Sequence, residues 1–213
     1  ATPSPGTAAP DPAAPGSARP PAMLHQRVIG QEALGQLAEA GEGAPDVVFG
    51  CAGGGSNLAG LTFPFLGRNL REGTTTRLVA CEPAACPSLT QGEYRYDFGD
   101  VAGLTPLLKM HTLGKDFVPP AIHAGGLRYH GMSPMVSHAV HLGLMDAVAV
   151  DQDEAFTAGT LFARSEGIIP APESTHAVAA EVAHAHAAHE PEDLGLGLSG
   201  RALHHLPAYA AYV

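Results

Sequence analysis

A glycine-rich turn carries the residues best suited to binding an anion. It reads Cys51-Ala52-Gly53-Gly54-Gly55-Ser56-Asn57 and lies between a short apolar run and a segment of helical pattern. Glycines let the backbone turn tightly and approach a ligand closely. Ser56 and Asn57 fall where the helix should begin, so free backbone N–H groups, the helix dipole and the Ser56 hydroxyl all favour an anion there. The turn therefore predicts a phosphate site, and a purely structural turn is the alternative.

The predicted phosphate cradle consists of Gly53, Gly54, Gly55, Ser56 and Asn57. Its spacing is neither the GxGxxG of dinucleotide-binding folds nor the GxxxxGK[ST] of the Walker loop. Dinucleotide and ATP binding are therefore weak interpretations.

A histidine-rich stretch near the C-terminus raises the question of a metal site. It contains His184, His186 and His189, with His204 and His205 further on. Metal-binding helices place two ligands at i and i+4 on one face. His184 and His186 instead point about 200° apart on a helix. We therefore expect histidines on a solvated helix surface and no metal site.

The elements that must position these residues alternate along the chain. Apolar periodicity and turn residues predict strands over 46–51, 77–82, 147–150 and 195–198, and helices over 28–40, 56–66, 133–142, 151–164 and 174–189. Asp151, with Glu154 three residues on, is typical of a capping box. Residues 83–133 are predicted to form a long loop region with short helices. The alternation favours an α/β fold with a parallel sheet flanked by helices on both faces.

Composition excludes several classes of protein. The 213 residues carry a net charge of −10 and 11 Lys+Arg, which argues against nucleic acid as a partner. No run of about eighteen apolar residues suggests a membrane span, and no secretory signal is recognisable. Three cysteines without zinc-ligand spacing indicate reduced thiols in a cytoplasmic protein. Residues 1–22, rich in Pro and Ala, are predicted to be disordered, and residues 23–213 to form one domain.

Three long strings resemble the C-terminal half of the tryptophan synthase beta chain, in its second, stand-alone type. They are LHQRVIGQEA (24–33), CEPAACPSLTQGEYRYDFGDVAGLTPLLKMHTLGKDFVPPAIHAGGLRYHGMSP (81–134) and LFARSEGIIPAPESTHA (161–177). GGGSN after a strand is similar to the cradle that holds the phosphate of pyridoxal 5'-phosphate (PLP) in that family. The resemblance implies the type II PLP fold, in which the cofactor lies between two α/β domains.

The resemblance also implies roles for single residues. Gly53 to Asn57 would hold the cofactor phosphate. Glu173 would lie close to the cofactor as a catalytic carboxylate, whereas its residue type alone indicates only a favourable charge at a helix start. His176, one turn further along, would face the substrate. Ser199 would donate a hydrogen bond to the pyridine nitrogen, and this neutral partner favours β-elimination and β-replacement over transamination.

Arg128 replaces an acidic residue that the classical beta chains carry in the loop AGGLRYHG. The guanidinium presents a bidentate fork suited to a carboxylate or a phosphate. We hypothesise that it holds an anionic group of the amino-acid substrate, such as that of O-phosphoserine. A salt bridge within the loop is the alternative.

Two departures from the family pattern affect the expected activity. Arg201-Ala202 follows the LSG motif where the stand-alone type usually has His-Gly, which puts the detailed contacts to the cofactor ring in doubt. The chain contains two lysines, Lys109 and Lys115, and both align away from the lysine that bonds the cofactor in the family. That lysine is needed to hold the cofactor and to move the α-proton, and it belongs to the N-terminal half.

Three interpretations follow from these observations. The first is a PLP-dependent carbon–oxygen lyase that forms L-tryptophan from indole and L-serine or O-phosphoserine, with a homodimer expected from the family. The second is a non-catalytic fragment, or one part of a split enzyme with a complementing N-terminal half. The third is another type II PLP enzyme, such as a serine or threonine dehydratase, against which the strings EYRYDFGD and AGGLRYHG argue.

Overall fold

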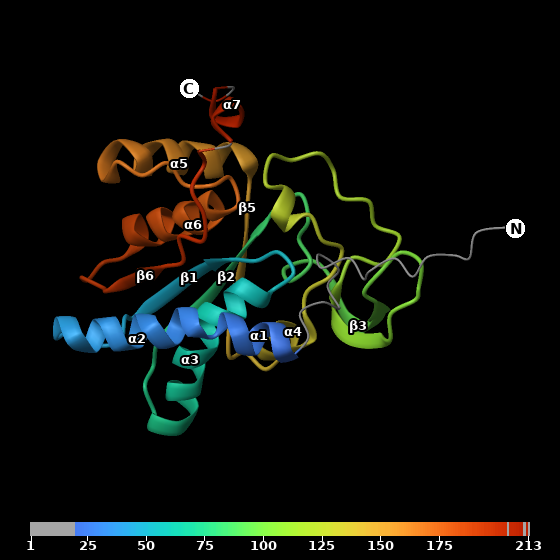
Figure 1. The fold of residues 1–213 in the computed structure, drawn as a ribbon, viewed down its shortest axis with the longest axis horizontal. Helices are drawn as coiled ribbons and strands as arrows, with labels where there is room; N and C mark the ends of the chain where they lie inside the picture. Colours follow the sequence, from blue (N-terminus) through green and yellow to red (C-terminus); the bar gives the residue numbers. More distant parts are fainter. Residues whose placement is uncertain (1–19, 204, 211, 213) are drawn as a thin grey trace, which may run out of the picture.

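A four-stranded parallel sheet organises the fold (Figure 1). The computed structural model describes residues 20–203, 205–210 and 212. The strand order is β5-β2-β1-β6, with β5 Asp146–Val150, β2 Arg77–Pro83, β1 Val47–Cys51 and β6 Leu194–Leu196. Helices cover both faces of the sheet, which confirms the predicted α/β class.

The two central strands are buried on both faces, because their side chains alternate between two apolar clusters. Val48 and Leu78 join the cluster beneath α1, α2, α3 and α4. Phe49 and Val79 join the opposite cluster beneath α6. Strands of this kind read as continuous apolar runs, and for this reason β1 and β2 could be predicted from the sequence.

The helices divide between the two faces. On one face lie α1 Pro20–Gln26, α2 Val28–Ala40, α3 Ser56–Glu72 and α4 Pro134–His141. On the other lie α5 Gln152–Glu166 and α6 Ser174–Ala187, and the short helices η2 Gly125–Leu127 and α7 Leu206–Tyr209 complete the described elements. None of the described helices is both long and apolar enough to cross a membrane.

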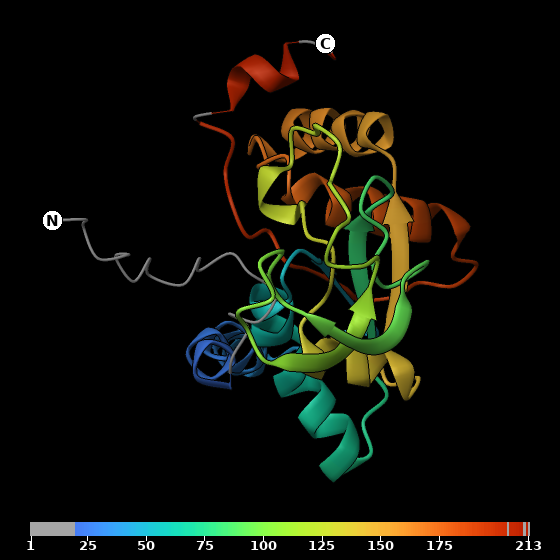
Figure 2. The same cartoon turned by 90° about the vertical axis from the view of Figure 1, so that its right-hand side faces the viewer.

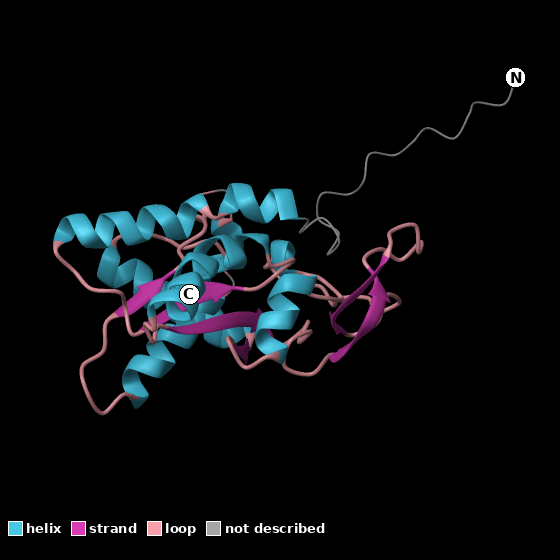
Figure 3. Cartoon of the chain, turned by 90° about the horizontal axis from the view of Figure 1, so that it is seen from below, coloured by secondary structure: helices cyan, strands magenta, loops and turns pink. Residues whose placement is uncertain are grey.

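An antiparallel hairpin lies beside the parallel sheet and corrects the prediction for residues 83–133. Strands β3 Glu93–Phe98 and β4 Leu107–Thr112 pair along their full length, and the hairpin projects from the body of the molecule (Figures 2 and 3). Most of its side chains are exposed or half-buried, so it lacks the apolar runs that mark β1 and β2. The buried Asp97 joins the two strands by accepting a hydrogen bond of 2.7 Å from the Thr112 hydroxyl.

Smaller differences concern the ends of elements. Helix α1 includes residues 20–22, which the prediction assigned to the disordered segment, and residues 1–19 lie outside the described part of the chain. Helix α3 continues through Pro64 to Glu72 instead of ending near residue 66. Asp151 occupies the N-cap position of α5 but makes no side-chain capping hydrogen bond, so the predicted capping box does not form.

Candidate functional site

Parallel pairing of β1 with β6 brings two distant segments together. Phe49 pairs with Leu196, so the glycine turn after β1 and Ser199 after β6 leave the sheet at the same edge. Ligands of α/β sheets bind in the crevice outside the carboxyl ends of such strands. A cavity of about 350 Å³ lies there, lined by Cys51, Gly53 to Leu58, Gly126, Leu127, Tyr129, Glu173 and Ser199.

The glycines of the turn meet two different steric demands. A Cβ on Gly53 would lie 2.4 Å from the carbonyl oxygen of Gly126, so the backbones approach too closely for a side chain. Gly55 is the N-cap of α3 and has φ +97°, a conformation that favours glycine. No side chain caps α3, so the N–H groups of its first turn are available to an anion.

Glu173 holds the opposite wall of the cavity in place. Its Oε1 accepts a hydrogen bond of 2.9 Å from the backbone N–H of Gly126, in the loop that faces the glycine turn. Glu173 occupies the N-cap position of α6 without making a side-chain capping bond. Its carboxylate therefore faces the cavity and is not occupied in capping the helix.

Ser199 is held by two groups, one of which the sequence reasoning missed. Its Oγ lies 3.1 Å from the Oγ of the fully buried Ser174 and 3.4 Å from the Sγ of Cys51. Burial raises the pKa of the Cys51 thiol, and the Glu173 carboxylate adds to this effect, so Cys51 stays protonated. Ser174 lies in the quoted PAPESTHA string, but nothing in the string shows that it meets Ser199.

Arg128 and His176 are not among the residues that line the cavity. The exposed Arg128 donates a hydrogen bond of 2.8 Å from Nη2 to the carbonyl oxygen of Pro119, within its own loop. This contact is neither the predicted substrate contact nor a salt bridge. His176 is buried, and its Nδ1 lies 3.0 Å from the carbonyl oxygen of Pro172. Their roles in substrate binding stay predictions.

The two lysines also lie away from the cavity lining. The ammonium of Lys109 stands 4.8 Å from the centre of the Tyr94 ring, on the hairpin. Lys115 forms an ion pair of 2.8 Å with the neighbouring Asp116. These contacts occupy both amines elsewhere, in line with their alignment away from the lysine that bonds the cofactor in the family.

The histidine-rich helix is less solvated than expected. His184 is half-buried, contacts the ring of Phe49 and lies 2.6 Å from a carboxylate oxygen of Glu192. His186 and His189 are exposed. Within the described residues, no three His, Cys, Asp or Glu side chains are grouped so that they could hold a metal ion.

His176 should make the fold sensitive to acid. Burial lowers the pKa of its imidazole, partly offset by the carbonyls of Pro172 and Glu173. The unfolded chain, with an ordinary histidine pKa of about 6.5, then binds the proton more readily than the folded chain. The free energy of unfolding should therefore fall as the pH drops below about 6.5. Urea unfolding from about pH 7.5 to about pH 5 should show this fall.

A matched pair of variants assigns the effect to this residue. His176→Asn should flatten the pH dependence, whereas His186→Asn, at an exposed position of the same helix, should leave it as in the wild type. An unchanged slope in the His176 variant would show that another group causes the acid sensitivity.

Known proteins share this sequence over most of its length. Over 177 residues the chain is 56% identical to the tryptophan synthase beta chain of Pseudothermotoga lettingae and 57% identical to tryptophan synthase beta chain 2 of Thermotoga maritima. Over 180 residues it is 54% identical to tryptophan synthase beta chain 2 of Methanosarcina acetivorans. These matches cover 82–83% of this chain but 40–42% of the relatives, so the chain spans about two fifths of their length.

Solved structures of lower identity share the fold. A threonine deaminase aligns with a TM-score of 0.62 at 22% identity, covering 84% of this chain and 53% of that one. A mutant of O-ureido-L-serine synthase, bound to O-ureido-L-serine, aligns with a TM-score of 0.63 at 20% identity, covering 90% and 49%. The sequence signature described as pyridoxal-phosphate dependent enzyme matches residues 9–200. This chain belongs to the family of pyridoxal-phosphate dependent enzymes, which takes PLP as its cofactor.

Proposed function

We propose that this chain supplies the phosphate-binding and ring-binding side of a PLP site that forms L-tryptophan from indole and L-serine or O-phosphoserine. The observation that carries the proposal is the meeting of the glycine turn, Glu173 and Ser199 in one cavity. Relatives of 54–57% identity that are named tryptophan synthase beta chains support the choice of reaction.

The donors of the cavity fit the cofactor at both ends. The uncapped first turn of α3, with the Ser56 hydroxyl and the Asn57 amide, would hold the phosphate. Ser199 would donate its hydroxyl proton to the pyridine nitrogen, and Ser174 and Cys51 hold that hydroxyl in place. When bound, PLP supplies the electron sink for loss of the α-proton and of the β-substituent.

The remaining side chains would act on the amino acid and on indole. Glu173 presents a carboxylate to the cavity, where it can accept a proton and return it. Arg128 would exchange the Pro119 carbonyl for the anionic group of the substrate, with O-phosphoserine as the stronger ligand because of its charge. His176, buried behind Glu173, would act on the substrate through the start of α6, since its Nδ1 lies 3.3 Å from the Glu173 carbonyl oxygen.

The lysine that bonds the cofactor would come from another polypeptide. Because Lys109 and Lys115 lie outside the cavity lining, we propose a complementing N-terminal half, with a homodimer of the assembled enzyme. The same observation favours a second candidate, a fragment that binds PLP without catalysis. All three cysteines are free thiols, as expected for the proposed cytoplasmic location.

Cofactor attachment tests the proposal directly. The purified chain is mixed with PLP, its visible spectrum is recorded, and its intact mass is measured after borohydride reduction. We expect reversible binding and no specific adduct, because neither lysine reaches the cavity. A stoichiometric adduct on Lys109 or Lys115 would contradict the need for a second polypeptide. Complete absence of binding would contradict the cradle.

Single hydroxyls then locate the bound cofactor. Ser56→Ala and Ser199→Ala should each weaken PLP binding about tenfold, because each removes one hydrogen bond to the ligand. Ser165→Ala removes an exposed hydroxyl on α5 and is the control. With the complementing half added, indole and serine should give tryptophan. A PLP-binding assembly that forms none would favour the non-catalytic candidate.

A further inference from the structure

Strand β5 is an edge strand without the usual protection. It pairs with β2 on one side, and no strand within residues 20–203, 205–210 and 212 pairs with its other side. Its sequence DAVAV has no lysine, proline or charge after Asp146. Natural edge strands are normally blunted by such residues, by bulges or by covering elements. The free side of β5 is therefore suited to pairing with a further strand.

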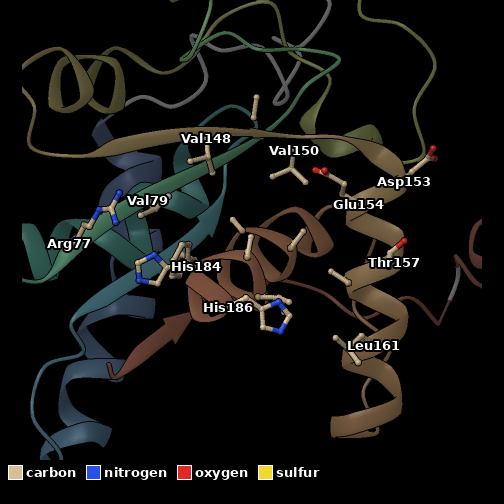
Figure 4. A pocket seen from close by; sticks show the side chains of 17 residues that line it. Arg77, Val79, Val148, Val150, Asp153, Glu154, Thr157, Leu161, His184 and His186 are labelled. Atoms are coloured by element: carbon tan, nitrogen blue, oxygen red, sulfur yellow. The ribbon is translucent and has the colours of Figure 1, made fainter. Parts of the chain in front are cut away.

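An apolar groove runs along the same strand, between β5, α5 and α6 (Figure 4). Val79, Val148 and Val150 line it from the sheet, and Leu161 lines it from α5. The Leu161 side chain is 51% exposed. An open apolar groove beside an open sheet edge is what remains when the next layer of a sheet is missing.

The charges around the groove are unequally distributed. Asp153 and Glu154 stand at the start of α5, and both are exposed. Arg77, at the other end of the groove, is already paired with Asp146 at 2.6 Å. The net charge of the whole chain is −10. A segment with basic side chains near Asp153 and Glu154 would therefore fit the groove best.

We propose that the free edge of β5 and the groove lined by Val79, Val148 and Leu161, together the β5 docking surface, bind the complementing polypeptide. This inference rests on the proposed function, which calls for such a polypeptide. The matched relatives carry more than half of their length outside the aligned region, since the match covers 42% of each. The occupant is an extended segment of that region, paired with β5, with apolar side chains facing the groove and a basic side chain near Asp153.

Co-expression tests the surface. The probe is the part of the Thermotoga maritima beta chain 2 outside the match, tagged and produced together with the full chain studied here. Leu161→Glu places a charge in the groove, whereas Leu107→Glu places the same charge on the hairpin at a site that is 54% exposed. We expect co-purification with the wild type and the Leu107 variant, and at least about a tenfold weaker complex with the Leu161 variant.

Hydrogen exchange locates the contact and separates the two ideas. Binding of the probe should protect residues 146–150, whereas added PLP should protect residues 53–57 through the cradle. Synthetic peptides tiling the probe provide a second measurement if the tagged polypeptide is insoluble. The inference is overturned by no binding of either probe, by protection elsewhere, or by a dimer of this chain that Leu161→Glu disperses. Because PLP protection is measured independently, its loss would count against the proposed function instead.

Discussion

Replacing Gly55 by alanine should remove phosphate binding at the start of α3 and destabilise the fold. Gly55 has φ +97°, and a Cβ there would lie 2.9 Å from both the Met132 Sδ and the Ser133 Oγ. Left-handed backbone costs about 1–2 kcal/mol for a residue with a side chain, and overpacking adds about 1–3 kcal/mol. Ser133 caps α4 through Val136, so relief of the clash would disturb that cap as well. Together these effects predict a loss of about 2–4 kcal/mol in the free energy of unfolding.

The neighbouring glycine gives the control for this experiment. Gly54 does not have positive φ, and a Cβ there would lie 3.5 Å from the Tyr129 ring, at ordinary contact distance. Gly54→Ala should therefore stay within about 0.5 kcal/mol of the wild type in urea unfolding. Calorimetric titration with PLP and with inorganic phosphate should show no binding to the Gly55 variant. Wild-type affinity and stability in that variant would mean that the turn does not depend on its left-handed residue.

The parts of the fold that could be predicted are those with strong local patterns. The apolar runs of β1 and β2 and the periodicity of α2 appear in the sequence because their burial is nearly uniform along a face. The β3–β4 hairpin could not be found in this way. Its stability depends on cross-strand pairing and on contacts of a few polar groups, such as Asp97 with Thr112, which are 15 residues apart.

The candidate site shows the same division. The glycine turn is a local feature, and its helix-start geometry follows from residue types alone. The contact between Glu173 and the N–H of Gly126 joins residues 47 positions apart, and that between Ser199 and Cys51 joins residues 148 apart. Only the sheet topology brings them together. Ser174 and Tyr129 were missed for this reason, since neither residue type at its position indicates a cavity wall.

Removing the carboxylate of Glu82 should cause the largest loss of stability among single substitutions in this chain. Glu82 is fully buried at the end of β2, next to the strand that leads into the glycine turn. It accepts hydrogen bonds from the N–H groups of Leu89 and Thr90, each at 2.8 Å, and from the hydroxyls of Thr90 at 2.7 Å and Ser88 at 3.3 Å. Burial raises its pKa, and the four donors oppose that effect.

Glu82→Ala leaves these donors buried without an acceptor and opens a cavity, so we expect a loss of about 3–5 kcal/mol in the free energy of unfolding. Glu82→Gln keeps the shape of the side chain but turns an NH₂ group towards donors, which predicts a smaller loss of about 2–3 kcal/mol. The loop would loosen with it, because the Leu89 side chain, buried in the main core, is fixed by the bond from its own N–H to Glu82. Glu39→Gln, on the exposed side of α2, is the matched control and should change the free energy by less than about 0.5 kcal/mol. Urea unfolding gives all three values. A Glu82→Gln chain as stable as the control would mean that the four donors find acceptors elsewhere, and that this loop is held by its apolar contacts alone.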